Sequence, residues 1–343
     1  MKKNSVIEFD IYTAVDNVSV TNSYVRVIER SLNSLGYKTH DIDRIIKTES
    51  NNNKGIVAIT PGIALKAKKA GYKNIIYWAQ GIVPEESLLR HENNIDRYLR
   101  YTILSYREKK ALQISNFVLF VSETMKRHYQ KKYKIHFNHY YIMPCFNETI
   151  NKEAFFTESK YSENIFTYAG SLDPWQCFEP TLKIFSEIEK VVSNAQFRIL
   201  TNKQEEAEKL VKKYKIKNYS IDFVPKERVP EELARAKFGF CLRKESPINR
   251  VATPTKLSSY ICLGVMPIYS DVLEDFYNQA KGCEYCLNIS ANAKKEDLQS
   301  IINLCTREVT AEQVLSSFEH YFRDYYSEEF HEAELKKRLK IMY

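Results

Sequence analysis

Short runs of apolar and β-branched residues alternate with longer helical patterns along this chain, and the alternation occurs twice. In the first half, strands are predicted at 6–11, 56–59, 74–78, 117–121 and 140–143. In the second half, they are predicted at 164–170, 196–200, 220–224, 238–242 and 266–269. Strands that alternate with helices are typical of parallel sheets covered by helices. The pattern therefore predicts two α/β sheets in series.

Helix signals lie between these strands. Apolar residues recur at helical spacing across 22–35, and Gly36 then provides a stop signal. Further helices are predicted at 180–192 and 256–263. A chain of 343 residues is also longer than one hydrophobic core usually supports. We therefore expect two domains.

The polar stretch 147–163 is rich in Glu, Lys, Asn and Ser, and it lies where the pattern restarts. We interpret it as the linker between an N-terminal domain over 1–150 and a C-terminal domain over 151–310. The last segment, 311–343, is typical of one or two polar-aromatic helices, which we expect to pack back across the domain junction. Two such sheets facing each other would bring the carboxyl ends of their strands to a shared cleft, where α/β sheets bind ligands.

Composition excludes several classes of protein. With 27% charged residues, 9 Gly and 10 Pro, the chain is neither low-complexity nor collagen-like. No stretch approaches the ~18–20 apolar residues of a membrane-spanning helix, and the first residues do not read as a signal peptide. The 7 Cys, an odd number at mostly long spacings, fit reduced thiols. These features predict a globular, cytoplasmic protein.

The formal net charge of +8 suits a phosphate-bearing partner, whether a nucleic acid, a nucleotide sugar or an anionic lipid head group. Charge alone does not choose among these partners. The chain contains neither a GxxxxGK phosphate loop nor a full GxGxxG motif, so kinase and dinucleotide-oxidoreductase functions have no support.

The segment 240–270 carries the strongest chemical signal. A strand ends at Arg243, a polar loop follows, and a helix is predicted to start at Thr253-Pro254 with Pro at its first position. Backbone N–H groups at a helix start bind phosphate, and Arg243 and Lys256 would add cationic donors on either side. We therefore expect an anion site here. The alternative is an ordinary surface loop with solvated charges.

This segment resembles the retaining glycosyltransferases of family 4 and their GT-B relatives. The matching residues, in order, are Leu242-Arg243, Asn249-Arg250-Val251-Ala252, Pro254-Thr255-Lys256, Tyr260 and Gly264-Val265-Met266-Pro267-Ile268. A glycine turn at Gly170-Ser171 and a strand end at Gln80-Gly81 extend the likeness over most of the chain. The resemblance implies an α/β GT-B fold, with two Rossmann-like domains facing across a cleft and C-terminal helices crossing back to the N-terminal domain.

The resemblance also implies roles for individual residues. A nucleoside-diphosphate sugar would be the donor, bound by the C-terminal domain, and the N-terminal domain would present the acceptor. The predicted catalytic residues are Arg243, Lys256 and Gln80. The predicted donor-binding residues are Gly170, Ser171, Asn249, Thr253, Thr255, Ser259 and Tyr260. No cofactor and no metal ion are expected.

Two positions depart from the family's pattern. Ser259 stands where relatives usually carry a Glu that holds the ribose hydroxyls, and Ser171 stands where basic residues often follow the glycine turn. A serine side chain makes only one or two neutral hydrogen bonds. We therefore expect weaker ribose binding or a compensating acid such as Glu245. We also expect Arg243 and Lys256 to carry most of the diphosphate charge.

Three other motifs have simpler interpretations. The Asp41-Ile42-Asp43 stretch matches the metal-binding DxD of another glycosyltransferase fold, but its setting favours a solvated turn. One CxxC pair, at 283–286, has no second pair or nearby His, so buried or loop cysteines are the simpler interpretation. The basic, Tyr-rich stretch 125–134 would suit an anionic membrane surface, and a solvated helix face is its alternative.

These features together predict a glycosyltransferase that moves a hexose to a hydroxyl of a glycan or lipid-linked oligosaccharide. By resemblance, the reaction would retain the anomeric configuration and need no metal ion. The Lys- and Asn-rich composition suggests bacterial surface-polysaccharide synthesis, in the cytoplasm and in peripheral contact with the inner face of the membrane. A non-catalytic GT-B-like subunit that binds glycans or a partner, and a sugar-nucleotide epimerase, are the alternatives. Nucleic acid is not expected as a partner.

Overall fold

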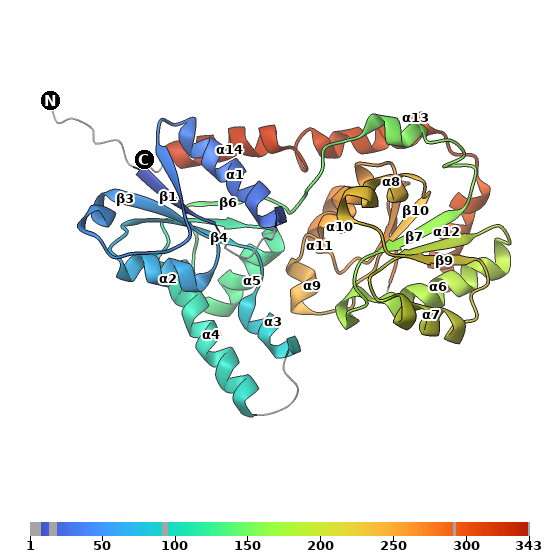
Figure 1. Ribbon diagram of the computed structural model, residues 1–343, viewed down its shortest axis with the longest axis horizontal. Coiled ribbons are helices and arrows are strands. Elements are labelled where there is room, and N and C mark those ends of the chain that lie inside the picture. Colours follow the sequence, from blue (N-terminus) through green and yellow to red (C-terminus); the bar gives the residue numbers. More distant parts are fainter. Residues whose placement is uncertain (1–7, 14–18, 91–94, 291–292, 342–343) are drawn as a thin grey trace. The chain divides into compact units, whose positions relative to one another are not determined.

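The computed structural model describes residues 8–13, 19–90, 95–290 and 293–341 (Figure 1). The chain divides into two compact units. Unit 1 comprises Met1–Cys145 together with Ser327–Tyr343, and unit 2 comprises Phe146–Tyr326. Each unit contains a parallel six-stranded sheet with helices packed on it.

The sheet of unit 1 has the strand order β2-β1-β3-β4-β5-β6. Its inner strands are the apolar runs that the sequence predicted, because a parallel strand is buried on both faces. Tyr77 and Trp78 are strand core, each about 1% exposed. The first predicted strand begins at residues 6 and 7, which lie outside the described residues. The strands are β1 (Glu8–Tyr12), β2 (Lys38–Ile42), β3 (Lys54–Ala58), β4 (Asn74–Ala79), β5 (Phe117–Phe120) and β6 (Tyr140–Ile142).

The edge strand β2 is not among the predicted strands, because its side chains are largely exposed and form no apolar run. It contains Asp41, the first acid of the DxD motif, so the expectation of a solvated turn is wrong for that residue. Asp41 accepts hydrogen bonds from the Arg26 guanidinium at 3.0 and 2.7 Å. Among the described residues, no group of three or more His, Cys, Asp or Glu could hold a metal ion.

The helices of unit 1 cover both faces of its sheet, with α1 and α14 on one face and α2 and α4 on the other (Figure 1). Arg30 of α1 donates hydrogen bonds to Glu328 at 2.5 Å and to Glu332 at 2.9 Å. The prediction that a C-terminal helix returns to the N-terminal domain is therefore confirmed. The helices are α1 (Ser19–Asn33), α2 (Pro61–Lys69), α3 (Val83–Arg90), α4 (Ile95–Ile114), α5 (Glu123–Tyr133) and α14 (Glu328–Lys340), with the 3-10 turn η1 (Glu49–Asn53).

The sheet of unit 2 has the order β12-β11-β10-β7-β8-β9. Its strands are β7 (Ile165–Ala169), β8 (Gln196–Leu200), β9 (Tyr219–Asp222), β10 (Phe238–Cys241), β11 (Met266–Tyr269) and β12 (Leu287–Asn288). The α-helices are α6 (Phe178–Val191), α7 (Gln204–Lys213), α8 (Val229–Ala234), α9 (Pro247–Val251), α10 (Thr255–Ile261), α11 (Glu274–Ala280), α12 (Lys295–Thr306) and α13 (Ala311–Phe318). The 3-10 turns are η2 (Lys152–Phe156), η3 (Pro174–Gln176), η4 (Lys226–Arg228) and η5 (Glu319–Phe322).

The polar stretch 147–163 is part of unit 2, so its interpretation as a linker is wrong. Phe155 is fully buried in it, and the Lys160 side chain is only 2% exposed. The Lys160 ammonium donates to the carbonyl oxygens of Ala154, at 3.0 Å, and of Leu263. Burial lowers the pKa of Lys160 to about 7. These contacts attach the stretch to the end of α10.

None of the helices in the described part of the chain combines the length and the apolar character needed to cross a bilayer.

Candidate functional site

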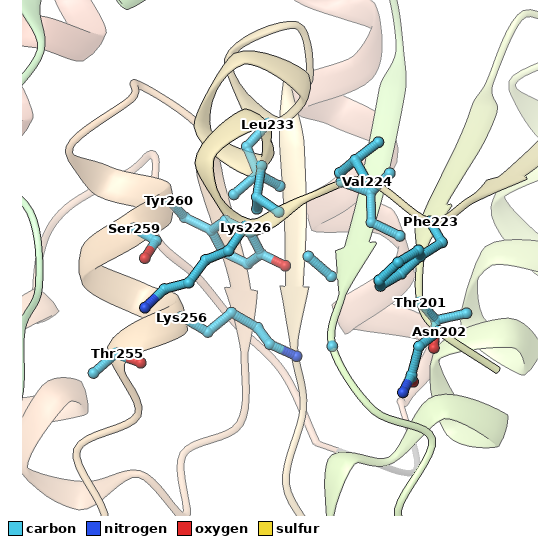
Figure 2. Close-up of a pocket in the computed structure, with 14 residues that line it drawn as sticks. Thr201, Asn202, Phe223, Val224, Lys226, Leu233, Thr255, Lys256, Ser259 and Tyr260 are labelled. Atoms are coloured by element: carbon cyan, nitrogen blue, oxygen red, sulfur yellow. The ribbon is translucent and has the colours of Figure 1, made fainter. Parts of the chain in front are cut away.

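A cavity of about 510 Å³ opens at the carboxyl ends of β7 and β8 in unit 2 (Figure 2). Open α/β sheets bind ligands at this edge. Five residues that the sequence singled out line the cavity: Gly170, Thr255, Lys256, Ser259 and Tyr260. The other lining residues are Ala169, Leu200, Thr201, Asn202, Phe223, Val224, Lys226, Val229 and Leu233.

Lys256 extends from the first turn of α10 toward the glycine turn that follows β7 (Figure 2). Its Nζ lies 4.4 Å from the centroid of the Tyr168 ring and donates to Gln176 Oε1 at 3.3 Å. Burial, with a smaller contribution from the positive charge of Arg243, lowers the pKa of Lys256 to about 7. A buried lysine with a lowered pKa keeps its charge more easily when an anion lies beside it. This position is therefore suited to a negatively charged ligand.

Gly170 gives the chain a bare backbone next to this cation. Its φ of +143° is one that L side chains rarely adopt. A Cβ atom at this position would also lie 3.4 Å from Lys256 Nζ, in contact with the ammonium. The absence of a side chain therefore leaves the Lys256 ammonium open to a ligand that approaches the turn.

Arg243 does not line the cavity, although it lies close enough to Lys256 to depress the pKa of that lysine. Its side chain is buried, and its guanidinium Nη1 donates to the Leu242 carbonyl at 2.8 Å. Its backbone N–H donates to Ser270 Oγ at 2.9 Å, which fixes the end of β10 beside β11. Arg243 therefore strengthens the positive field behind Lys256.

The helix start differs from the prediction. The loop after β10 first forms the short helix α9, capped by Ser246, and α10 then begins at Thr255 with Pro254 as its N-cap residue rather than as its first residue. The residue before a proline rarely adopts the helical conformation, which explains why the chain breaks between α9 and α10 at Thr253. Because α10 has only 7 residues, we expect the side-chain cations to attract an anion more strongly than the N-terminus of this helix does.

Three of the predicted residues hold the loops around the cavity rather than line it. Asn249 donates from its amide to the Lys244 carbonyl at 2.8 Å, and Ser171 donates to Asp173 Oδ2 at 2.6 Å. Thr253, only 9% exposed, lies in the link between α9 and α10. These residues support the shape of the site.

The expectation that Glu245 compensates for Ser259 is wrong. Glu245 accepts two hydrogen bonds from Arg250, at 2.6 and 2.8 Å, and does not line the cavity. Ser259 instead donates to Asn147 Oδ1 at 3.1 Å. Burial raises the pKa of the neighbouring acid, Glu148, and the charge of Lys226 only partly offsets this rise. Glu148, in the stretch 147–163, does not line the cavity but interacts electrostatically with Lys226, which does.

Lys226 and Phe223 line the cavity and escaped the sequence interpretation. Both follow β9, and Figure 2 shows Lys226 reaching toward α10 and the Phe223 ring on the opposite side of the cavity. Phe223 is 65% exposed, so its ring is accessible to a ligand. The predicted strand 220–224 included this residue, whereas β9 ends at Asp222. The signal that could have found it is an aromatic residue directly after a strand, at the edge of the sheet where ligands bind.

In unit 1, Gln80 follows β4 and is exposed, with its amide 3.5 Å from the Ile59 carbonyl. The loop after it rests on the buried acid Glu108, whose Oε1 accepts from the Val83 N–H at 3.1 Å. Tyr133 donates to Glu108 Oε2 at 2.6 Å, and the Tyr129 hydroxyl lies 3.1 Å from Oε1. Burial raises the pKa of Glu108 to about 7.

No protein-family model matches the chain, and no curated protein matches it in sequence. Solved structures do match. A mutant of TarM from S. aureus, in complex with fondaparinux, alpha-GlcNAc-glycerol and UDP, has a TM-score of 0.64 at 11% identity, over 93% of this chain and 58% of its own. WaaG, a glycosyltransferase involved in lipopolysaccharide biosynthesis, has a TM-score of 0.60 at 14% identity, over 97% and 99%. Sucrose-phosphate synthase from Thermosynechococcus elongatus has a TM-score of 0.62 at 11% identity, over 98% and 99%.

The chain has a GT-B fold. Its two Rossmann-like units are the two sheets described above, and the predicted fold class is confirmed. At identities of 11–14% the likeness is one of fold, and this chain spans 58% of the TarM chain that it matches. The catalytic and donor-binding roles of individual residues therefore stay predictions.

Proposed function

We propose that this protein transfers a hexose from a nucleoside-diphosphate sugar to a hydroxyl of a glycan or lipid-linked oligosaccharide, with retention at the anomeric carbon and without a metal ion. The observation that carries the proposal is the juxtaposition, in one cavity, of the Lys256 ammonium and the bare backbone at Gly170. A diphosphate needs both a cation and a backbone that it can approach closely.

The rest of the cavity suits the other parts of such a donor. A volume of about 510 Å³ falls within the ~300–1,000 Å³ range of small-molecule sites. The exposed Phe223 ring offers a surface on which a base can stack, and Lys226 supplies a second cation. Ser259, which also lines the cavity, can hydrogen-bond a hydroxyl of the ribose between the base and the diphosphate.

The proposed chemistry is electrostatic. As the bond between sugar and phosphate breaks, negative charge grows on the departing diphosphate, and Lys256, backed by Arg243, stabilises that charge. This stabilisation is larger in the transition state than in the bound donor, so it raises kcat and not only affinity. Gln80 in the acceptor-binding unit would hydrogen-bond the sugar. The departing phosphate accepts the proton of the acceptor hydroxyl.

Binding of donors to the purified protein tests this proposal. We expect one of UDP-, GDP-, ADP- or CMP-sugars to raise the melting temperature of the full chain, because a ligand that binds only the folded state stabilises it. Saturation-transfer NMR on the same panel reports contact with the base and the sugar. Binding of none of them would contradict the proposal and favour a non-catalytic subunit, which the serine at 259 would explain. Product formed without an acceptor would favour an epimerase.

A membrane-associated acceptor is supported by helix α4 rather than by the stretch 125–134. In α5, Met125, Tyr129 and Tyr133 are buried, and Lys132 pairs with Glu85 at 2.8 Å. Helix α4 instead exposes apolar and aromatic side chains, and Figure 1 shows its first half projecting from the sheet of unit 1. The exposed fractions are 66% for Tyr98, 59% for Leu99, 44% for Ile103 and 64% for Tyr106.

Cations flank these side chains and line a groove of about 690 Å³ between α2 and α4. The basic residues of the groove are Lys68, Lys69, Arg107 and Lys110. Apolar side chains beside cations are typical of helices that rest on anionic bilayers. We propose that unit 1 contacts the anionic face of a membrane through α4 and reaches a lipid-linked acceptor there.

Vesicle binding tests this contact. The double variant Arg107→Gln/Lys110→Gln is expected to bind phosphatidylglycerol-containing vesicles about 30-fold more weakly than the unaltered protein, because each cation near such a surface contributes about 1 kcal/mol. The matched control is Arg127→Gln/Lys131→Gln on α5, which is expected to bind like the unaltered protein. Equal losses in both double variants, or no affinity for these vesicles, would contradict a specific role of α4.

A further inference from the structure

Two thiols occupy one tight turn at the edge of the unit 2 sheet, immediately before β12. Cys283 is half-buried and Cys286 is buried. The Cys286 N–H donates to the Cys283 carbonyl at 3.2 Å, which closes a turn over Cys283–Cys286. Such a turn brings its first and fourth Cα atoms within about 7 Å, and disulfides join Cα atoms about 4.4–6.8 Å apart. The backbone therefore already holds the two cysteines at a separation compatible with a disulfide.

The two residues between the cysteines are held from outside the turn. Arg307, just beyond α12, donates to Glu284 at 2.9 Å and to the Tyr285 hydroxyl at 3.2 Å. On the inner side, Cys286 Sγ lies 3.9 Å from the hydroxyl oxygen of Tyr321. The turn is therefore fixed on both sides, and a bond between its two sulfurs would need little movement of the chain.

Both cysteines line a cavity of about 400 Å³ that is open to solvent, together with Arg307 and the polar side chains Asn288, Ser300 and Asn303. A small thiol reagent can therefore reach the pair. A third metal ligand is missing: in the described part of the chain, no group of three His, Cys, Asp or Glu side chains could hold a metal ion. Two thiols alone do not make a structural zinc site, which needs four ligands.

We propose that Cys283 and Cys286 are a redox-active pair that forms an intramolecular disulfide by exchange with a low-molecular-weight disulfide, RSSR. The Cys283 thiolate attacks one sulfur of RSSR, forms a mixed disulfide and releases RS⁻. Cys286 then attacks the Cys283 sulfur, expels the second RS⁻, and gives up its proton. The sum is protein dithiol plus RSSR giving protein disulfide plus two RSH, so the protein loses two hydrogen atoms and RSSR is reduced.

The order of the two thiols follows from their surroundings. A hydrogen bond from Cys286, the largest contribution, lowers the pKa of Cys283 to about 7, and burial raises the pKa of Cys286 well above its usual value. Only a thiolate is a nucleophile. Cys283, the more exposed of the two, is therefore the attacking sulfur and Cys286 the resolving one. This pair is independent of the proposed sugar transfer, since neither cysteine lines the donor cavity.

Oxidised glutathione is the probe for the first experiment. The full chain is titrated with it, free thiols are then alkylated, and peptides are identified by mass spectrometry. We expect a reversible disulfide between Cys283 and Cys286, while the other five of the 7 cysteines stay alkylatable after denaturation. Without oxidant, native Cys283 should react with iodoacetamide at pH 7 about 10-fold faster than half-buried Cys145, because an ordinary thiol is only a few per cent ionised at that pH.

Single variants separate the two roles. Cys286→Ser is expected to stop at a glutathione adduct on Cys283, whereas Cys283→Ser is expected to form no adduct at position 286. Circular dichroism of each variant checks that it folds. The proposal is overturned if the unaltered protein forms no disulfide between these residues at any glutathione ratio. It is equally overturned if Cys283→Ser acquires the adduct as readily as Cys286→Ser does.

Discussion

A Lys256→Met variant is expected to cleave its donor about 100- to 1,000-fold more slowly than the unaltered protein, with the fold intact. Methionine keeps most of the length and apolar bulk of the lysine and removes only the ammonium that faces Gly170 and the Tyr168 ring. Removal of one preorganised donor at a developing negative charge typically costs this much in kcat. The measurement is release of nucleoside diphosphate from the donor that the binding panel selects.

The matched control is Lys212→Met, which removes a cation from the same unit at a side chain that is 69% exposed and outside the cavity. It should react at the normal rate. Thermal unfolding of both variants checks that they are folded. Normal donor cleavage by Lys256→Met would refute the assignment of the charge-stabilising role to this residue, even if the donor still bound.

The same lysine makes donor affinity depend on pH. With a pKa of about 7 in the empty cavity, Lys256 loses its charge as pH rises from 6 to 8.5. A diphosphate restores the charged form, so above pH 7 binding must take up a proton, and Kd should rise up to about tenfold per pH unit. Calorimetry in buffers of different ionisation enthalpy measures this uptake directly. The uptake should disappear in Lys256→Met.

A Glu108→Gln variant is expected to remove a pH dependence from the stability of unit 1. The pKa of Glu108 is raised from 4.5 to about 7 by burial, so the folded state prefers the protonated acid. Its contribution to stability is fully present below pH 4.5 and is lost as pH rises through 7. A shift of this size corresponds to about 3 kcal/mol. Glutamine keeps the shape and cannot ionise, so the variant should be the more stable of the two at pH 8.

Burial outweighs the hydrogen bonds from Tyr133 and Tyr129, each of which lowers the pKa of Glu108. The contact with Tyr129 can also be made by the protonated acid. The Tyr129 hydroxyl donates to the Gly81 carbonyl at 2.8 Å and lies 3.1 Å from Glu108 Oε1, and a hydroxyl has one proton to give. A protonated Glu108 can supply the second proton. Hydrogen exchange of the Val83 amide at pH 5.5 and pH 8, corrected for intrinsic rates, measures the effect locally. An unaltered difference between the two pH values in Glu108→Gln would show that another group is responsible.

The sequence located the inner strands because parallel strands are buried on both faces and are therefore apolar throughout. It missed β2, whose side chains are largely exposed, and it read 147–163 as a linker because the stretch is polar. What holds that stretch in unit 2 is the buried Lys160, whose partners are backbone carbonyls. Main-chain partners of this kind leave no trace in a composition pattern.

The site divides in the same way. Gly170 and Lys256 could be found because each belongs to a recognisable sequence motif, and the two residues do meet in space. Lys226 and Phe223 could not be found in this way. They reach the same cavity from the segment after β9, which is the edge strand beyond β8. The prediction for Glu245 is wrong for a physical reason. Arg250, five residues away, already satisfies its carboxylate.

Unit 1 is built from two pieces of chain separated by the whole of unit 2, and this fixes an order of assembly during synthesis. The face of α1 around Arg30 and Ser31 is covered by α14, which begins only at Glu328. A ribosome therefore finishes unit 2 before it releases the helix that completes unit 1. Until then, nascent unit 1 displays an uncovered helix face, which is a natural binding target for chaperones that meet the growing chain.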